Sequence, residues 1–314
     1  MSKAKPTVVL TDPFIPEVIE RELKPRAQVL IARDRKHLEK LIAGADALIT
    51  RFSDRVDEAL LAKAPRLRAI GNFAVGFDNI DFKACARRGI RVTNTPDVLT
   101  RATAELTLAL LLACARRLPE GEALCRRGRF GGWDPRMLLG LELKGRRAVI
   151  VGRGRIGGET ARLFRGIGLK VEFITREDSA AAVRTKLRRA QVLSLHVPLS
   201  AATRHWLDAR KLALLPRDAI VLNTTRGPVV DEQALIRALS AKPQSRRIFA
   251  AGLDVYEREP EIPAALRKLP NTVLLPHLGS ATHEARTAMA RLAVSGVLAL
   301  LGGGRPSNEV RFPR

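Results

Sequence analysis

The segment at residues 147–157 constrains the fold of this chain more than any other part of the sequence. A short apolar, β-branched run there ends in the pattern Gly152-x-Gly154-x-x-Gly157, and a helical pattern follows at once. A dinucleotide pyrophosphate needs this order of strand, tight turn and helix. We expect Gly152 to permit the turn and Gly154 to let the backbone approach the phosphates. Gly157 lets the helix pack on the strand, and the N–H groups of the first helical turn then face the anion.

Strand-like and helix-like segments alternate along the chain in two series. The first series has strand-like segments at residues 7–10, 28–32, 45–50, 67–71 and 90–93. The second series starts at the glycine turn and has them at residues 147–151, 170–175, 192–195, 219–223, 248–253 and 273–275. Alternation of this kind predicts parallel sheets that helices cover on both faces. The expected fold is therefore α/β, with two doubly wound parallel-sheet domains.

The segments outside the two series complete this prediction. An Ala- and Leu-rich pattern predicts one long helix over residues 97–118, and glycines and a proline break the excursion that follows over residues 119–141. A final helix is predicted over residues 284–301. The second series has no sheet partner left for this helix, so we expect it to return to the first domain. The tail Gly302-Gly-Gly-Arg-Pro is predicted to be a flexible end.

The return of the last helix implies that one domain is inserted in the other. We predict a Rossmann-type dinucleotide-binding domain at residues 99–282. It is inserted in a flavodoxin-like substrate-binding domain formed by residues 1–98 and 283–314. Hinges between the two domains are expected near residues 96–101 and 278–284.

The chain carries a large positive charge. Its 314 residues include 55 Lys and Arg against 32 Asp and Glu, a formal net charge of +23. The basic residues are scattered in pairs, and aromatic residues make up only 4% of the chain. Little is therefore available for base stacking, and we do not expect nucleic acid as a partner. The charge instead favours the attraction of an anionic substrate and cofactor.

Cysteine usage and apolar segments predict a cytoplasmic protein without a metal or a membrane partner. Cys85, Cys114 and Cys125 are odd in number and form no Cys-x-x-Cys pattern, which indicates reduced thiols. Paired His or Cys residues at metal-binding spacing are not found in the sequence. The apolar run at residues 106–115 is too short to span a bilayer, and the first residues do not have the pattern of a secretory signal.

Several further motifs accompany the glycine turn. They are Asn223-Thr-Thr-Arg-Gly227, Asp254-Val-Tyr-Glu-Arg-Glu-Pro260, Pro276-His-Leu-Gly-Ser280, residues 71–81 and His196-Val-Pro-Leu199. With this set the chain resembles the D-isomer-specific 2-hydroxyacid dehydrogenases, and among them the glyoxylate/hydroxypyruvate reductases. The resemblance covers about residues 70–282 and is only architectural over residues 1–65.

Reduction of a 2-oxo acid needs a cation for the carboxylate and carbonyl, a proton donor, and a hydride donor fixed on one face. Arg226 and His277 each lie just past a predicted strand, where α/β sheets build their sites. The resemblance implies that Arg226 binds the substrate, that His277 donates the proton, and that Glu259 holds the far nitrogen of this histidine. Glu257 remains the alternative carboxylate. The sequence identifies no carboxylate partner for the other histidines, which are His37, His196, His205 and His283.

The resemblance also assigns residues around the substrate and the cofactor. Val75 and Gly76 would offer their N–H groups to the substrate carboxylate, and Asp254 would hydrogen-bond the nicotinamide amide. The full set of predicted cofactor-binding residues is Thr103, Gly152, Gly154, Arg155, Ile156, Gly157, Thr175, Arg176, Val197, Pro198, Thr224, Thr225, Asp254 and Gly279.

The end of the second strand of the cofactor domain bears on the choice between NADP(H) and NAD(H). Folds that prefer NAD place an acid there for the ribose 2′-OH, but this chain has Thr175 followed by Arg176. Arg176 would attract a 2′-phosphate, which an acid would repel. Glu172 lies inside the strand and is expected to face away. We therefore predict that NADP(H) is preferred, with NAD(H) as the alternative.

The combined prediction is NAD(P)H-dependent reduction of a small anionic 2-oxo acid to the D-2-hydroxy acid, with His277 as proton donor. An NAD-dependent 3-phosphoglycerate dehydrogenase is an alternative that the basic surface favours, although no regulatory domain follows the last helix. A dinucleotide-sensing co-regulator is the alternative from another class, and the set Arg226, Glu259 and His277 counts against it. The resemblance implies a homodimer through the helix at 97–118 and the excursion after it.

Overall fold

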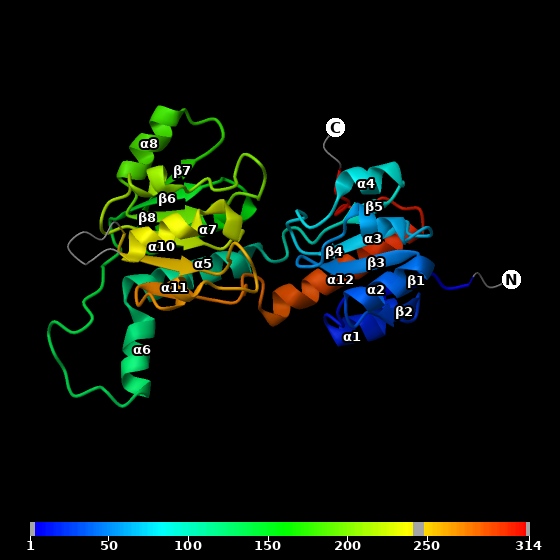
Figure 1. The fold of residues 1–314 in the computed structure, drawn as a ribbon, viewed down its shortest axis with the longest axis horizontal. Coiled ribbons are helices and arrows are strands. Elements are labelled where there is room, and N and C mark those ends of the chain that lie inside the picture. The colour runs from blue at the N-terminus through cyan, green and yellow to red at the C-terminus, as the bar shows by residue number, and fades with distance from the viewer. Residues whose placement is uncertain (1–3, 241–247, 312–314) are drawn as a thin grey trace. The chain divides into compact units, whose positions relative to one another are not determined.

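The structure is a computed structural model that describes residues 4–240 and 248–311. The described residues form two compact units (Figure 1). Unit 1 comprises the described residues up to Leu99 and those from Ala281 onward, and unit 2 comprises those within Thr100–Ser280. The chain therefore leaves unit 1 once and returns to it once.

Unit 1 is built on a five-stranded parallel sheet in the order β2-β1-β3-β4-β5. The central strands are almost wholly buried, as apolar strands of a parallel sheet are when helices cover both faces. This is the flavodoxin-type order, in which the winding direction reverses between β1 and β3. The strands are β1 (Thr7–Leu10), β2 (Gln28–Ile31), β3 (Ala47–Arg51), β4 (Ala69–Phe73) and β5 (Arg91–Thr93).

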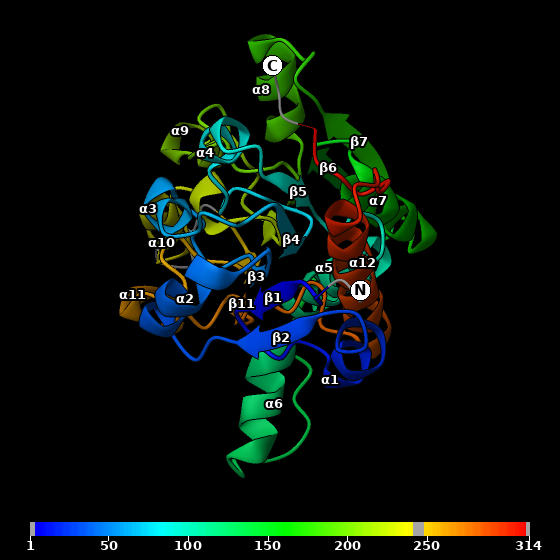
Figure 2. The same ribbon diagram turned by 90° about the vertical axis from the view of Figure 1, so that its right-hand side faces the viewer.

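Helices cover both faces of this sheet (Figure 2). One face carries α2 (Arg35–Leu41) with the short η2 (Ile42–Gly44), α3 (Glu58–Ala62) and α4 (Phe82–Arg87). The other face carries α1 (Pro16–Val18), the π-helical turn η1 (Ile19–Leu23) and the long α12 (His283–Leu301). As predicted, the last helix packs on the first sheet.

Local sequence explains where these helices begin and how closely they pack. Asp34, Asp57 and Asp81 cap α2, α3 and α4, because each carboxylate accepts the N–H of the residue three positions on. Gly71 in β4 lets α12 approach the sheet, since a Cβ at this position would lie 2.7 Å from Cγ2 of Val297.

Unit 2 is built on a six-stranded parallel sheet in the order β11-β10-β9-β8-β6-β7. Counted from β6 the order is 2-1-3-4-5-6, whereas the classic dinucleotide fold has a further strand outside the second. β7 is therefore the edge of the sheet, and the winding direction reverses between β6 and β8. The strands are β6 (Arg147–Val151), β7 (Lys170–Ile174), β8 (Val192–Leu195), β9 (Ile220–Asn223), β10 (Ala250–Leu253) and β11 (Thr272–Leu274).

Two layers of helices enclose this second sheet (Figure 1). One layer holds α5 (Thr100–Ala115) and α7 (Arg155–Gly166), which pack around the fully buried Phe164. The other layer holds α8 (Ala180–Arg188), α9 (Ala209–Leu212), α10 (Glu232–Ser240) and α11 (Ala264–Arg267). The predicted fold class, two doubly wound parallel-sheet domains, is confirmed.

Two local predictions are wrong. The single helix expected over residues 97–118 ends at Ala115, the backbone turns at Arg117 with φ 54°, and a second helix, α6 (Leu118–Arg126), begins with Pro119 in its first turn. Proline suits a first turn, so it starts a new helix here rather than ending one. The tail after α12 is also not a free end, because Glu309 forms an antiparallel bridge to Thr93 on the edge of the first sheet.

Candidate active site

The glycine turn after β6 has the geometry that a dinucleotide requires. Gly152 has φ 98°, and a Cβ there would overlap the carbonyl oxygen of His196. A Cβ on Gly157 would overlap the carbonyl oxygen of Gly152, so α7 can pack on the turn only through glycine. Gly154 is the N-cap of α7, and a Cβ there would meet no atom within 4 Å. The residues present therefore fit a pyrophosphate laid against Gly154 and the first N–H groups of α7.

The turn after β7 carries charges of both signs. Arg176 is almost fully exposed (94% of its side chain), and its guanidinium lies 3.9 Å from Glu177. Thr175 donates its hydroxyl to Glu177 (3.3 Å) and its N–H to Asp178 (2.8 Å). The hydrogen bond from Lys186, with that from the Thr175 N–H, lowers the pKa of Asp178. The sequence analysis weighed Thr175, Arg176 and Glu172 and missed the acids Glu177 and Asp178 on this turn.

Glu172, in contrast, is turned away from this end of β7. Its carboxylate contacts Arg147 at the start of β6 (3.4 Å) and Arg189 after α8 (2.6 Å). Both partners lie at the opposite end of the sheet from the glycine turn, so the expectation that Glu172 faces away is confirmed.

His277 and Glu259 form a hydrogen-bonded pair just beyond the carboxyl ends of β10 and β11. Nδ1 of His277 lies 2.8 Å from Oε2 of Glu259, whose other oxygen accepts the N–H of Tyr256 (3.1 Å). Burial acts to raise the pKa of Glu259, but the hydrogen bond and charge of His277, the Tyr256 N–H and the charge of Arg226 outweigh it and lower this pKa overall. Glu259 is therefore an anion that can stabilise a protonated imidazole.

Asp254 shapes the turn that carries His277. Its fully buried carboxylate accepts the N–H of Leu278 (2.6 Å) and the N–H of Gly279 (2.8 Å). Its main-chain oxygen accepts the N–H of His277 itself (2.9 Å), whose backbone has φ 58°. Burial raises the pKa of Asp254. The geometry thus gives Asp254 a turn-stabilising role, and its contact with a nicotinamide amide stays a prediction.

The loop that carries Arg226 is pressed against the loop that carries Glu259. Asn223, buried at the end of β9, accepts the N–H (3.1 Å) and the hydroxyl (2.8 Å) of Thr225 and donates to the carbonyl of Arg226 (3.0 Å). A Cβ on Gly227 would overlap the main chain of Tyr256. Asn223 and Gly227 therefore shape the loop that carries Arg226, a role that sequence reasoning did not give them, although both lie within the motif at residues 223–227.

The other predicted cofactor residues gather at the same end of the second sheet. The hydroxyl of Thr103 in α5 donates to the carbonyl of Gly279 (2.9 Å), and Thr107 bonds Thr224 through their hydroxyls (3.0 Å). Val197, directly after β8, would contact a Cβ on Gly152 at 3.1 Å, so it borders the glycine turn. The structure therefore brings these residues of unit 2 to one edge, but contact with a cofactor stays a prediction.

A second histidine–carboxylate pair joins His205 to Glu257, which lies on the same loop as Glu259. Nε2 of His205 lies 2.8 Å from Oε1 of Glu257, and this carboxylate also accepts the N–H of Glu232 (3.1 Å). The sequence identified no carboxylate partner for His205, because this partner comes from a segment distant in sequence. The same contact turns Glu257 away from His277, which leaves Glu259 as the carboxylate at that histidine.

In unit 1, the loop after β4 presents main-chain donors. The N–H groups of Val75 and Gly76 donate to no acceptor among the residues that the structure describes. Consecutive free N–H groups in such a loop form a cradle for an anion. This geometry is compatible with the predicted role of Val75 and Gly76 toward a carboxylate.

The described part of the chain offers neither a helix for a membrane span nor a side-chain cluster for a metal ion. None of its helices is long and apolar enough to cross a membrane. Its His, Cys, Asp and Glu side chains form no group of three or more that could hold a metal ion.

Comparison with known proteins places the chain among close relatives. Residues 108–279 match the sequence model of the D-isomer specific 2-hydroxyacid dehydrogenase, NAD binding domain. A glyoxylate reductase of Thermococcus litoralis is 44% identical over 287 residues, which cover 87% of this chain and 85% of that protein. A glyoxylate reductase of Aeropyrum pernix is 40% identical over 333 residues, which cover 98% of this chain and 96% of that protein.

Solved structures agree over nearly the whole chain. The TT0316 protein from Thermus thermophilus superimposes with a TM-score of 0.91 at 40% identity, covering 97% of this chain and 100% of that one. The NADPH-dependent glyoxylate/hydroxypyruvate reductase of Sinorhizobium meliloti, in complex with NADP and malonate, has a TM-score of 0.87 at 33% identity, with 98% and 97% covered.

Proposed function

Because the chain belongs to the D-isomer specific 2-hydroxyacid dehydrogenase family, we propose that it reduces a small 2-oxo acid of the glyoxylate or hydroxypyruvate type to the D-2-hydroxy acid. It is an oxidoreductase that binds a nicotinamide dinucleotide and acts on a CH–OH group or its oxidised form. The observation that carries the proposal is the Glu259–His277 pair, with Arg226 close enough to lower the pKa of Glu259.

Each member of this set has one task in the reduction. When bound, the reduced cofactor supplies the hydride that adds to the carbonyl carbon of the substrate. The guanidinium of Arg226 holds the substrate carboxylate and polarises the carbonyl. His277 gives the proton on its ring to the carbonyl oxygen as negative charge develops there, and Glu259 stabilises the imidazolium before that transfer.

The N–H groups of Val75 and Gly76 belong to the same proposal as donors to the substrate carboxylate. Unit 1 is thereby assigned to substrate binding and unit 2 to dinucleotide binding. A helix N-terminus behind a glycine turn supports the second assignment, because it places N–H groups and the positive end of the helix dipole toward a pyrophosphate.

The preferred cofactor in this proposal is NADP(H), with NAD(H) as the alternative. Thr175 occupies the position where an acid would hydrogen-bond an unphosphorylated ribose, and the exposed Arg176 can pair with a 2′-phosphate. Glu177 works in the opposite direction, because its carboxylate lies near both residues. A comparison of kcat/KM for NADPH and NADH decides the preference, and a higher value with NADH refutes it.

A homodimer completes the proposal. The segment around α6 exposes large apolar side chains, among them Leu118, Phe130, Trp133 and Leu139. Trp133 leaves 84% of its surface exposed. Large exposed apolar side chains grouped in this way are typical of a protein–protein contact surface. Light scattering in solution should give twice the mass of the 34.4 kDa chain, and a monomer would contradict the expectation.

The substrate class is tested by a steady-state panel with both reduced cofactors. Glyoxylate, hydroxypyruvate, pyruvate and 3-phosphohydroxypyruvate are compared by the loss of reduced-nicotinamide absorbance. We expect the highest kcat/KM with glyoxylate or hydroxypyruvate. A clear preference for the phosphorylated acid would favour a phosphoglycerate dehydrogenase, and dinucleotide binding without turnover would favour a sensor.

A further inference from the structure

Three successive carbonyls of the loop after β4 are held by donors from the body of unit 1. The carbonyl of Ala74 accepts the N–H of Thr95 (2.9 Å). The carbonyl of Val75 accepts Nδ2 of Asn94 (2.8 Å), and the carbonyl of Gly76 accepts Nδ2 of Asn72 (2.7 Å). Over residues 74–76 the loop is therefore anchored through three successive carbonyl acceptors.

This anchoring fixes the direction of the N–H groups. A peptide unit is planar, so a bond that holds the carbonyl of one residue also orients the N–H of the next. The bond to Ala74 orients the N–H of Val75, and the Asn94 bond orients the N–H of Gly76. The Asn72 bond orients the N–H of Phe77 in the same way. None of these three N–H groups donates to an acceptor within residues 4–240 and 248–311.

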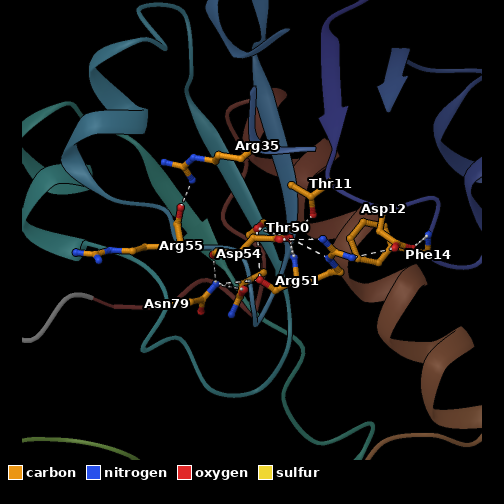
Figure 3. A network of polar contacts seen from close by, with 10 residues as sticks. Thr11, Asp12, Phe14, Arg35, Thr50, Arg51, Asp54, Arg55 and Asn79 are labelled. Carbon is orange, nitrogen blue, oxygen red and sulfur yellow. Dashed lines mark hydrogen bonds and ion pairs between the residues drawn. The ribbon is translucent and has the colours of Figure 1, made fainter. Parts of the chain in front are cut away.

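Both asparagines are themselves fixed by hydrogen bonds from neighbouring segments of unit 1. Asn72 is fully buried, and its Oδ1 accepts Nδ2 of Asn79 (3.2 Å). Asn79 also donates to the carbonyls of Arg51 (3.0 Å) and Asp54 (3.1 Å), which ties the loop to the turn after β3 (Figure 3). The side-chain contacts of Asp54 with Arg51 hold that turn in place.

Asn94 is held by the C-terminal segment. The N–H of Asn94 donates to the carbonyl of Asn308 (3.1 Å), and Nδ2 of Asn308 donates to the carbonyl of Asn94 (2.8 Å). Asn308 is buried and also donates to Leu292 in α12 (3.3 Å). The contact with α12 and the pairing of Glu309 with β5 therefore hold Asn308, which in turn holds the main chain of the residue whose side chain orients the Gly76 N–H.

We propose that Asn94 and Asn72 are positioning residues. Asn94 aims the N–H group of Gly76 at the substrate carboxylate, Asn72 adds the neighbouring N–H group of Phe77 to the donors Val75 and Gly76, and Asn308 holds Asn94 for this task. The inference rests on the proposed function, since that function makes this loop the carboxylate cradle. N–H groups that already point at the anion site need no reorganisation when the anion binds. The side chains that hold these N–H groups in place therefore affect the affinity for the anion.

The variants are chosen to separate positioning from simple support of the fold. Asn94→Ala removes the donor to Val75, and Asn308→Ala removes one of the two hydrogen bonds that hold the Asn94 main chain, without touching the loop. Asn271→Ala is the matched control, because the amide of Asn271 also donates to a main-chain carbonyl (Phe249, 3.1 Å), but it does so within unit 2. The melting temperature is measured for each variant to follow the structural cost.

Two measurements distinguish a failure of the positioning role from a failure of the proposed function. Turnover of glyoxylate by the unaltered protein tests the function alone. Binding of oxalate, a carboxylate that needs no turnover, is measured by calorimetry in the presence of NADPH and tests the positioning. We expect the affinity for oxalate to fall about tenfold in Asn94→Ala and by less in Asn308→Ala. Where turnover occurs, kcat/KM for glyoxylate should fall by the same factors, and the KM for NADPH should not change.

Asn271→Ala should keep oxalate affinity within about twofold, even if it lowers the melting temperature as much as Asn94→Ala does. If folded Asn94→Ala and Asn308→Ala bind oxalate as tightly as the unaltered protein, the asparagines only satisfy carbonyls and the inference is overturned. If the unaltered protein does not reduce glyoxylate but Asn94→Ala still weakens oxalate binding, the proposed function fails and the positioning role stands.

Discussion

Replacement of Glu259 by glutamine probes the charge behind the proton donor while it preserves the shape of the side chain. In the structure Oε2 of Glu259 lies 2.8 Å from Nδ1 of His277, and Oε1 accepts the Tyr256 N–H. Glutamine can keep an acceptor for one of these donors but carries no charge. The substitution therefore removes the stabilisation of the imidazolium with little change in packing.

The size of the effect follows from this contact. Only 28% of the Glu259 side chain and 23% of the His277 side chain are exposed, so solvent screens the pair weakly. A hydrogen bond to a charged partner contributes about 1.5–3 kcal/mol net, and each 1.4 kcal/mol is about a factor of ten. We expect kcat/KM for glyoxylate to fall about 10- to 100-fold in Glu259→Gln.

The matched control is Glu257→Gln on the same loop. Glu257 contacts His205 rather than His277, so its loss should leave kcat/KM within about threefold of the unaltered protein. The assay is steady-state oxidation of NADPH from acidic to alkaline pH, with NADPH affinity measured separately. Equal losses in both variants, or an unchanged kcat/KM in Glu259→Gln, would refute the assignment of Glu259 as the carboxylate that supports proton transfer.

Three further predictions rest on other parts of the structure. Gly227→Ala would force a Cβ into the main chain of Tyr256, so we expect loss of more than about tenfold in kcat/KM together with a lower melting temperature; near-normal values of both would contradict the close packing of the two loops. Arg176→Glu should lower kcat/KM for NADPH by about tenfold or more and leave that for NADH nearly unchanged, because a carboxylate repels a 2′-phosphate; equal effects on both cofactors would remove Arg176 from the cofactor site. Burial acts to raise the pKa of Asp54, but hydrogen bonds from Arg51 and Thr11 lower it overall. The ionised carboxylate therefore stabilises unit 1 at every pH above its unfolded pKa of about 3.9. This stabilisation is lost as the pH falls through the lower pKa of the folded state. Asp54→Asn should therefore reduce the free energy of unfolding by about 1–3 kcal/mol at neutral pH, with a smaller difference in acid, and an equal difference at both pH values would contradict this.

The glycine turn and the two parallel sheets could be predicted because their signals are local. Gly152 and Gly157 leave no room for a side chain, and the apolar strands are short runs bounded by turns, so the pattern and the structure report the same constraint. The strand order of unit 2 could not be read in this way. It depends on which strand pairs with β6, and that pairing is a contact between distant segments.

The misjudged features share this dependence on tertiary contact. Glycines after α12 indicate a flexible tail only if nothing binds the residues that follow, but Glu309 and Asn308 pair with the edge of the first sheet. The contact between His205 and Glu257 is hidden for the same reason. Glu257 and Glu259 are both acids on one loop, and only the partners of each carboxylate distinguish their roles.

The most direct test of the central claim is the turnover of His277→Ala with glyoxylate and NADPH. If the ring of His277 delivers the proton, kcat should fall by about 10²–10⁴ while the dissociation constant for NADPH stays within about twofold of the unaltered protein. A variant that keeps most of its turnover, or an unaltered protein that binds NADPH and never oxidises it with any 2-oxo acid, would contradict the account.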